Sequence, residues 1–532
     1  MYINDKILIG KNDETEVNLL LNKANRHGII TGASGSGKTI TLKVLAESFS
    51  DARVPVFLVD VKGDLAGMTL PGDIESVKER AEKMKLVDFN MKSYPTNFWD
   101  VYGVKGHPIR TTVSSLGSDL LSRMLDLTDA QEGVLAIVFK VAKDEDKEII
   151  DLKDLQAMLK YVGENQKEYS LKYGNVTTQS VGAVQRSLLK LEEQGGDLFF
   201  GKPDFEIKDF MKYSEIDGRG YINVFDATTL FRKPALYSIF LLWLLNTLYD
   251  TSDEVGDLEK PKLVFFLDEA HLIFSEMPEH IIKNLTSIVK LIRSKGIGVY
   301  FISQSPSDIP DEILSQLGNR VQHVLRYYTK ADEKSIKAAC NSFRDNPKFN
   351  TEEVITQLKT GEALVSVQTI DGEPSVVERV KILPPQSKMG TIDDSVREDT
   401  IKDGMFYGKY ENKVDPESAF EKINKEKEEK LKQELEVQQQ EEQDRINSEN
   451  RFTEQSDNMT ERFVQEHSVL RKDGESYTTP TPSKTTTKTT SRRRVGRPRK
   501  TKLEKATDRV TNTALNTVGR RIGNSIFKGL FK

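Results

Sequence analysis

Residues 32–39 read Gly-Ala-Ser-Gly-Ser-Gly-Lys-Thr, which fills every fixed position of the phosphate-binding pattern GxxxxGK(S/T). Residues 27–31 before it have the apolar character of a short buried strand, and residues 40–49 after it carry apolar side chains at helical spacing. A strand, a glycine-rich turn and a helix N-terminus together place backbone amides and a helix dipole around one anion. The stretch therefore predicts an α/β fold with a phosphate-binding loop. A chance glycine-rich turn is the alternative, which the flanking strand and helix disfavour.

We expect a nucleotide to lie against the whole loop and the first turn of the helix that follows it. The glycines allow the backbone to wrap closely around an anion. Lys38 is placed to reach the β- and γ-phosphates, and the Thr39 hydroxyl is placed to ligate Mg²⁺. The predicted nucleotide contacts are Gly32, Ala33, Ser34, Gly35, Ser36, Gly37, Lys38, Thr39 and Ile40.

A second part of the nucleotide site follows an apolar run of strand length, Leu263 to Leu267. Asp268 and Glu269 come directly after this run, in the pattern known as Walker B. A carboxylate in this position orders the Mg²⁺ shell through water, and a neighbouring glutamate polarises the water that attacks the γ-phosphate. We assign Asp268 to the metal and Glu269 to the general base. A buried strand that ends in a solvated acidic turn is the alternative.

Residues 268–271, Asp-Glu-Ala-His, also spell the DEAH box of superfamily-two helicases. Such an enzyme has a Ser-Ala-Thr motif after its next strand and a QxxGRxGR motif in a second motor lobe. Here the next strand, Ile297 to Ile302, runs into Ser-Gln-Ser-Pro, and no second lobe is found. We therefore interpret His271 as a helix-start or site-lining residue.

Five further polar residues are candidates for the site. Gln304 follows the strand beside Walker B, where it is placed to sense the γ-phosphate or to hold the attacking water, with a strand-end cap as the alternative. Arg320 and Arg326 lie around a later strand, and each is either an arginine finger for a neighbouring subunit or part of an ordinary ion pair. Asp60 and Asp64 follow another strand and either touch the metal shell or cap a turn.

The composition of the 532-residue chain, 37% hydrophobic and 30% charged, is that of a soluble protein with polar extensions. The one cysteine, Cys340, excludes an internal disulfide and fits a reducing compartment. Because no charged-then-apolar leader opens the chain, we expect a cytoplasmic protein. The most apolar stretch, Ala235 to Tyr249, is too short for a membrane span and predicts a buried helix, so we expect no membrane partner.

The C-terminal end differs in charge from the rest of the chain. Ser491 to Lys532 holds 13 Lys and Arg against two acids, a net charge of +11, and because the whole chain carries −5, residues 1–490 carry −16. Arg492 to Lys500 contains Gly-Arg-Pro and resembles an AT-hook for the A·T-rich minor groove, with a merely basic tail as the alternative. Both interpretations favour nucleic acid as a partner. Val510 to Phe531 has the spacing of a basic amphipathic helix, which would dock on protein or on a membrane surface.

The sequence predicts six segments. Residues 1–70 and 219–385 form the ATPase core, and residues 71–218 between them form a mainly helical insertion. A double proline at 384–385 ends the core. Beyond it we expect a charged helical extension over 386–476, in which Glu417 to Arg445 favours a solvated helix, with a coiled coil as the alternative. A disordered basic linker over 477–509 and the amphipathic helix over 510–532 follow.

Taken together, these motifs resemble those of a HerA-like ATPase of the YjgR type, within the HerA/FtsK superfamily of ring-forming DNA motors. The matching runs, in chain order, are Gly32 to Thr39, Val59 to Leu65, Gly106 to Thr112, Leu127 to Leu135, Leu267 to Leu272, Arg293 to Phe301 and Ser303 to Arg326. The later motifs are weak one by one, and their order and number carry the resemblance over residues 1–385. The short segment before the phosphate loop departs from archaeal HerA helicases, which have an N-terminal β-barrel, and residues 386–510 have no counterpart in the pattern.

The resemblance implies a RecA-like core, ATP and Mg²⁺ as ligands, and a homohexameric ring with nucleotide sites between subunits. It also implies the roles given above for Asp268, Glu269, Gln304 and one arginine near 320–326. Our leading hypothesis is a ring-shaped DNA translocase or helicase-like motor that contacts DNA through its channel and its basic tail. The competing hypothesis is an ATPase that remodels or scaffolds a protein partner, such as a nuclease or a defence effector. A kinase for a small metabolite is disfavoured by the acid pair and Gln304.

Overall fold

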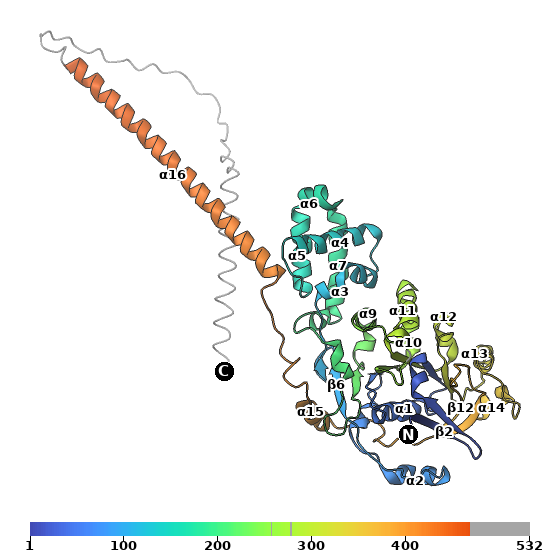
Figure 1. Cartoon of the computed structure of the whole chain (residues 1–532). Coiled ribbons are helices and arrows are strands. Elements are labelled where there is room, and N and C mark those ends of the chain that lie inside the picture. Colours follow the sequence, from blue (N-terminus) through green and yellow to red (C-terminus); the bar gives the residue numbers. More distant parts are fainter. Residues whose placement is uncertain (257, 277–278, 469–532) are drawn as a thin grey trace, which may run out of the picture. The chain divides into compact units, whose positions relative to one another are not determined.

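Strands from the beginning of the chain and from residues 362–382 join in one mixed sheet. We describe a computed structural model, which covers residues 1–256, 258–276 and 279–468 (Figure 1). Thirteen strands within these residues form the sheet in the order β1-β2-β13-β12-β11-β4-β10-β9-β5-β8-β6-β7, with β3 paired to β2. The strands are β1 (Tyr2–Ile3), β2 (Lys6–Lys11), β3 (Glu16–Leu20), β4 (Gly28–Thr31), β5 (Val56–Asp60), β6 (Thr96–Asp100), β7 (His107–Pro108), β8 (Ile222–Asp226), β9 (Leu263–Leu267), β10 (Ile297–Ser303), β11 (Asn319–Gln322), β12 (Glu362–Ser366) and β13 (Glu378–Ile382).

The sheet has a parallel part and an antiparallel part. From β11 to β7 every neighbouring pair is parallel, whereas β12, β13 and β1 to β3 pair in antiparallel fashion. Within the parallel part β10 lies between β4, which leads into the phosphate loop, and β9, which leads into Asp268. The fold is therefore the predicted α/β type with a RecA-like P-loop core, and its ligand edge is the one where the parallel strands end.

Helices cover both faces of the parallel strands, which are buried on both sides and accordingly read as continuous apolar runs. On β5, Val56 and Leu58 share one core with helix α1 (Lys38–Asp51), while Phe57 and Val59 share the opposite core with α9 (Pro234–Thr251) and α11 (Glu279–Ile292). Helix α9 contains the apolar stretch that we predicted to be a buried helix, and its central residues are buried. Within the described residues, no helix has both the length and the apolar character needed to span a bilayer.

The segment predicted as a mainly helical insertion contains most of its residues in helices, and Figure 1 shows α3 to α7 gathered in one bundle. The bounds are α2 (Ile74–Lys83), α3 (Val113–Met124), α4 (Asp129–Asp144), α5 (Leu152–Glu164), α6 (Gln166–Tyr173), α7 (Thr178–Glu193) and α8 (Gly196–Phe199). The same segment also supplies β6 and β7 to the sheet, beside β8. We did not predict these strands, because β6 is only five residues long and its burial depends on distant parts of the chain.

The chain after Pro385, which we expected to be an extension, packs against the core as far as Ile423. The ring centroid of Trp99 on β6 lies 5.1 Å from that of Phe406 and 5.9 Å from that of Tyr410. Helix α15 (Asp394–Lys402) belongs to the same segment. Contacts between residues this far apart produce no local sequence pattern from which the packing of this segment could have been predicted. Helix α16 (Ala419–Ser468) follows, and its residues from Lys427 to Arg462 are all exposed, as expected of a solvated helix.

Three predictions concern residues outside the described ranges. The linker over 477–509, the AT-hook-like Arg492 to Lys500 and the amphipathic helix over 510–532 therefore stay predictions.

Candidate active site

The phosphate loop is a concave turn whose shape requires glycine. Gly32, Gly35 and Gly37 have φ angles of 150°, 72° and 114°, in the region that favours glycine. A Cβ added to Gly32 would lie 2.5 Å from the Cβ of His323. Within the described residues the amides of Gly35, Gly37 and Lys38 donate no hydrogen bond. The loop therefore presents free donors to an anion at the start of α1, as predicted.

Neighbouring segments hold the loop from outside. The Ala33 amide donates to the Val324 carbonyl at 2.9 Å, and the Gly361 amide donates to the Ser36 carbonyl at 3.0 Å. Arg80 of α2 in turn donates to the Gly361 carbonyl at 2.6 Å. These contacts fix the loop before any ligand binds.

His323 lies beneath the loop and was not predicted to belong to the site. Burial lowers its pKa to about 4, so the ring is neutral near pH 7. Its Nδ1 lies 3.0 Å from the Glu362 carbonyl and its Nε2 lies 2.8 Å from the Thr41 hydroxyl. The ring therefore donates from Nδ1 and accepts at Nε2. No local signal in the sequence identifies His323 or Arg80, because their partners lie on other elements.

The strand register brings the predicted residues to one edge. Phe301 of β10 pairs with both Ile29 of β4 and Leu267 of β9, and Ser303 pairs with Thr31. The residues that follow these strands are Gly32, Gln304 and the acid pair Asp268–Glu269, and they therefore emerge at nearly the same level. Since neighbouring strands lie about 4.8 Å apart, the phosphate loop and the acid pair flank Gln304 closely.

The charges of Lys38, Asp268 and Glu269 influence one another. Lys38 donates from Nζ to the carbonyls of Gly32 at 2.6 Å and Ala33 at 3.1 Å. Burial lowers the pKa of the Lys38 ammonium, and the charges of Glu269 and Asp268 oppose this change. Burial and then the charge of Glu269 raise the pKa of Asp268 to about 7. The lysine and the two acids thus form one electrostatic unit.

Glu269 is held in an unusual state. It is buried, and its φ of 50° lies in the left-handed region, which is costly for a residue with a side chain. One carboxylate oxygen contacts the Lys62 ammonium, and the other lies 3.2 Å from Nδ1 of His271, in the first turn of α10 (Ala270–Glu276). Burial opposes ionisation of Glu269, but the hydrogen bond and charge of Lys62 outweigh it and hold the pKa below its ordinary value.

Lys62 was not predicted as a site residue, although it lies in the strand-end turn that we singled out for Asp60 and Asp64. The Asp60 carboxylate accepts hydrogen bonds from the amides of Gly63 at 2.6 Å and Leu65 at 3.1 Å. These bonds match the turn-capping alternative for Asp60. They fix the turn from which the Lys62 side chain reaches Glu269.

Gln304 and the two arginines occupy different surroundings. Gln304 is exposed directly after β10. Arg320 donates to the carbonyls of Leu317 at 3.1 Å and Leu314 at 3.0 Å, which precede β11 and lie away from the ligand edge. Arg326 follows β11, is exposed, and makes no ion pair or side-chain hydrogen bond with the described residues. Arg326 is thus accessible to solvent, whereas Arg320 is held by carbonyls of its own chain.

The residues present fit a nucleotide with a hydrated metal ion. The free amides and the buried Ser36 hydroxyl, which has no hydrogen-bond partner within the described residues, suit phosphate oxygens. Thr39 in the first turn of α1 and Asp268 offer oxygen atoms for Mg²⁺. Among the described residues no cluster of three or more His, Cys, Asp or Glu forms a protein-only metal cage. Mg²⁺ bound through phosphate and water needs no such cage.

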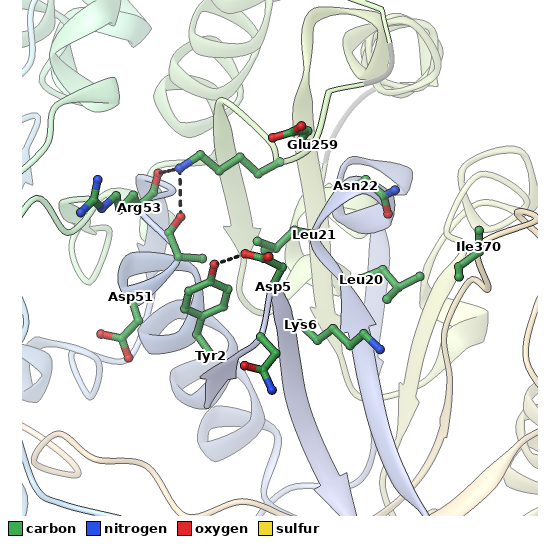
Figure 2. A pocket seen from close by; sticks show the side chains of 13 residues that line it. Tyr2, Asp5, Lys6, Leu20, Leu21, Asn22, Asp51, Arg53, Glu259 and Ile370 are labelled. Carbon is green, nitrogen blue, oxygen red and sulfur yellow. Dashed lines mark hydrogen bonds between the residues drawn. The ribbon is translucent and has the colours of Figure 1, made fainter.

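A separate pocket of about 610 Å³ lies near the opposite edge, where the parallel strands begin (Figure 2). Lys260, which precedes β9, donates to the carbonyls of Ala52 and Arg53 there, both at 3.1 Å. Tyr2 donates to Asp5 at 2.6 Å. None of the predicted site residues lines this pocket.

A phosphate loop and a Walker B acid pair at the ligand edge of a RecA-like sheet define a P-loop ATPase, and the protein is an ATP-hydrolysing enzyme. The chain belongs to the HerA-like helicase family, because the family described as "Helicase HerA-like C-terminal" matches residues 5–532. The predicted family resemblance is thereby confirmed.

Known relatives and structures are similar over most of the chain. The DNA double-strand break repair helicase HerA of Sulfurisphaera tokodaii is 25% identical over 395 residues, which cover 71% of this chain and 70% of that protein. The helicase of the same name from Saccharolobus solfataricus is 23% identical over 378 residues, with 70% and 67% covered. Among solved structures, the bacterial conjugative coupling protein TrwB gives a TM-score of 0.48 at 14% identity, over 73% of this chain and 91% of that chain. VirB4 of Thermoanaerobacter pseudethanolicus gives 0.46 at 18% identity, over 72% and 98%.

Proposed function

We propose that this protein is an ATP-driven DNA translocase or helicase-like motor that works as a homo-oligomeric ring, with six subunits as the expected number. The observation that carries the proposal is the convergence of Lys38, Asp268, Glu269 and Gln304 at one sheet edge. Relatives named DNA double-strand break repair helicases support DNA as the substrate.

Each residue has a defined role in the proposed reaction. The loop amides and Lys38 would bind the β- and γ-phosphates, and Thr39 and Asp268 would hold the Mg²⁺ shell. Mg²⁺ neutralises charge on the phosphate oxygens when it is bound. Glu269 takes the proton of the attacking water, and Gln304 orients that water.

Arg326 is our candidate for the arginine finger. Because β11 lies on the side of β4 away from β10 and β9, Arg326 follows a strand remote from the acid pair of its own subunit. Its guanidinium is exposed and has no partner among the residues that the structure describes, so it is free to act at the nucleotide of a neighbour in a ring. Mass measurement with and without ATP tests the assembly, and a particle that stays monomeric with ATP contradicts the ring.

DNA-stimulated hydrolysis tests the motor itself. We expect single- or double-stranded DNA to raise phosphate release at low salt, and the stimulation to fall steeply as salt increases. Replacing Arg492, Arg493 and Arg494 by alanine should weaken the stimulation and leave DNA-free turnover unchanged. If DNA has no effect on turnover, the proposed motor function is wrong. An ATPase that remodels or scaffolds a protein partner then becomes the better assignment.

A further inference from the structure

Lys62 pairs a long, half-exposed side chain with a buried acid, Glu269. Its ammonium contacts Glu269, whose side chain is 7% exposed, whereas the Lys62 side chain itself is 50% exposed. The backbone below Lys62 is held by the Asp60 hydrogen bonds to Gly63 and Leu65. Lysine is a compact charge on a flexible four-carbon stem, so its head group changes partner without backbone movement.

The charges around Lys62 leave it ready for a second partner. Lys38 is already engaged by two loop carbonyls, and its charge repels that of Lys62. The acids close enough to act on Lys62 are Glu269, Asp268 and Asp64. One oxygen of Asp64 and one of Glu269 have no hydrogen-bond partner within the described residues. A γ-phosphate placed between Lys38 and Glu269 would bring a stronger anion within reach of the same ammonium.

We propose that Lys62 exchanges partners: it restrains Glu269 in the nucleotide-free site and moves to the γ-phosphate when ATP binds, which releases Glu269 for the attacking water. This inference rests on the proposed role of Glu269 as the base. ADP lacks the γ-phosphate and leaves Lys62 on Glu269. Lys62 is thus a positioning residue that couples the presence of the triphosphate to the freedom of the carboxylate.

Binding without turnover tests the exchange. The two probes are ADP and adenylyl imidodiphosphate, whose β,γ-bridge resists hydrolysis, each titrated with Mg²⁺ by calorimetry. Lys62→Met should weaken the triphosphate analogue about tenfold, as expected for one charge-assisted hydrogen bond, and change ADP affinity by less than about twofold. Lys62→Arg should keep most of the preference for the triphosphate.

Lys105→Met is the matched control. Lys105 is 43% exposed, lies 3.6 Å from Asp226 at the end of β8, and donates to Thr228 at 2.9 Å. It therefore resembles Lys62 in exposure and pairing, but its acid partner is Asp226 on β8 and not a member of the acid pair after β9. We expect this variant to leave both affinities unchanged.

Glu269→Gln supplies the second measurement. The neutral amide frees Lys62 in advance, so the analogue should bind several-fold more tightly than to the wild type, and this gain should vanish in the Lys62→Met double variant. Equal losses for both nucleotides in Lys62→Met, or no loss for either, would overturn the exchange. These titrations need neither DNA nor hydrolysis, so a failure of DNA stimulation alone leaves the exchange of Lys62 intact. If the wild type bound neither nucleotide, both the exchange and the proposed function would be wrong.

Discussion

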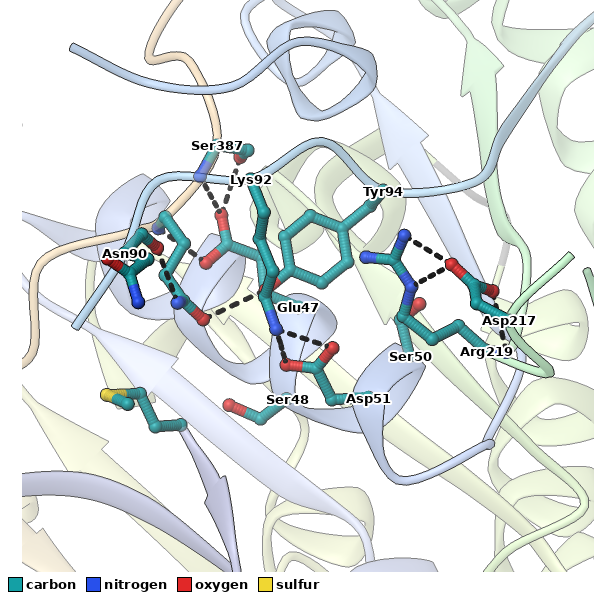
Figure 3. Close-up of polar contacts among 12 residues, drawn as sticks. Glu47, Ser48, Ser50, Asp51, Asn90, Lys92, Tyr94, Asp217, Arg219 and Ser387 are labelled. Carbon is teal, nitrogen blue, oxygen red and sulfur yellow. Dashed lines mark hydrogen bonds and ion pairs between the residues drawn. The ribbon is translucent and has the colours of Figure 1, made fainter. Parts of the chain in front are cut away.

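Two buried glutamates, Glu47 and Glu269, show how differently the protein treats the same side chain. Both are almost fully buried, at 2% and 6% exposure. On α1, Glu47 accepts hydrogen bonds from the Gln386 amide at 2.8 Å and from the Ser387 amide and hydroxyl at 3.1 and 2.5 Å (Figure 3). Glu269 contacts Lys62 through one oxygen, and its other oxygen lies 3.2 Å from Nδ1 of His271 but accepts no hydrogen bond from the described residues.

The difference separates a structural acid from a reactive one. The donors around Glu47 are two backbone amides and one hydroxyl of the segment after Pro385, and Lys43 beside it donates to the Lys388 carbonyl at 2.9 Å. Nearby in Figure 3, Asp51 pairs with Lys92 at 2.7 Å. The far end of α1 is thus joined to the rest of the fold by satisfied contacts. Incomplete pairing at Glu269, at the ligand edge, leaves capacity for a substrate.

The largest expected effect is that of Lys38→Ala at the start of α1. Loss of the ammonium removes its charge-assisted contacts to the phosphates, so nucleotide affinity should fall at least about a hundredfold. Calorimetric titration with the ATP analogue measures it. Undiminished affinity in this variant would mean that the phosphate loop is not the nucleotide site.

Glu269→Gln should reduce ATP turnover by about a hundredfold to ten-thousandfold, because an amide cannot accept the proton of the attacking water. ATP should stay bound, since the phosphate contacts are intact. Phosphate release and nucleotide titration on the same preparation check both parts. Turnover at the wild-type rate would remove Glu269 from the role of base.

Glu47→Ala should leave nucleotide affinity within about threefold but lower the free energy of unfolding by about 3 kcal/mol. Three donors lose their buried acceptor, and the Lys43 ammonium loses a nearby negative charge. Urea unfolding measures the stability. Glu79→Ala on α2, where the glutamate is exposed and pairs with Lys83, is the control and should leave stability unchanged. A loss of nucleotide binding without a loss of stability would refute the division between the two glutamates.

Ser387→Ala should have the smallest effect. It removes one hydroxyl donor to Glu47 and keeps both amide donors, so we expect a loss of about 1 kcal/mol in the free energy of unfolding. The same urea experiment measures it. A loss as large as that of Glu47→Ala would show that Ser387 acts through something other than its bond to Glu47.

Sequence reasoning located the elements of the site but not the contacts between them. The phosphate loop, β9 with Asp268 and Glu269, and Gln304 after β10 each follow from a pattern within a few residues. Lys62 was missed as a partner of Glu269, and Arg320 could not be separated from Arg326, because a side chain's partner is not written in its own neighbourhood. For the same reason the predicted core ended at Pro385, although the following segment packs on α1 and β6.

The sequence by itself determined the phosphate loop, the parallel strands around it and the chemistry of their terminal residues, because turn geometry, apolar runs and residue type act over short distances. Only the tertiary structure decided that Lys62 meets Glu269, that His323 and Arg80 support the loop, and that Glu47 is satisfied by residues about 340 positions away. Those contacts depend on strand order and packing, which bring distant segments into one buried environment. Because the dielectric constant there is low, the role of each charge depends on which partners it has.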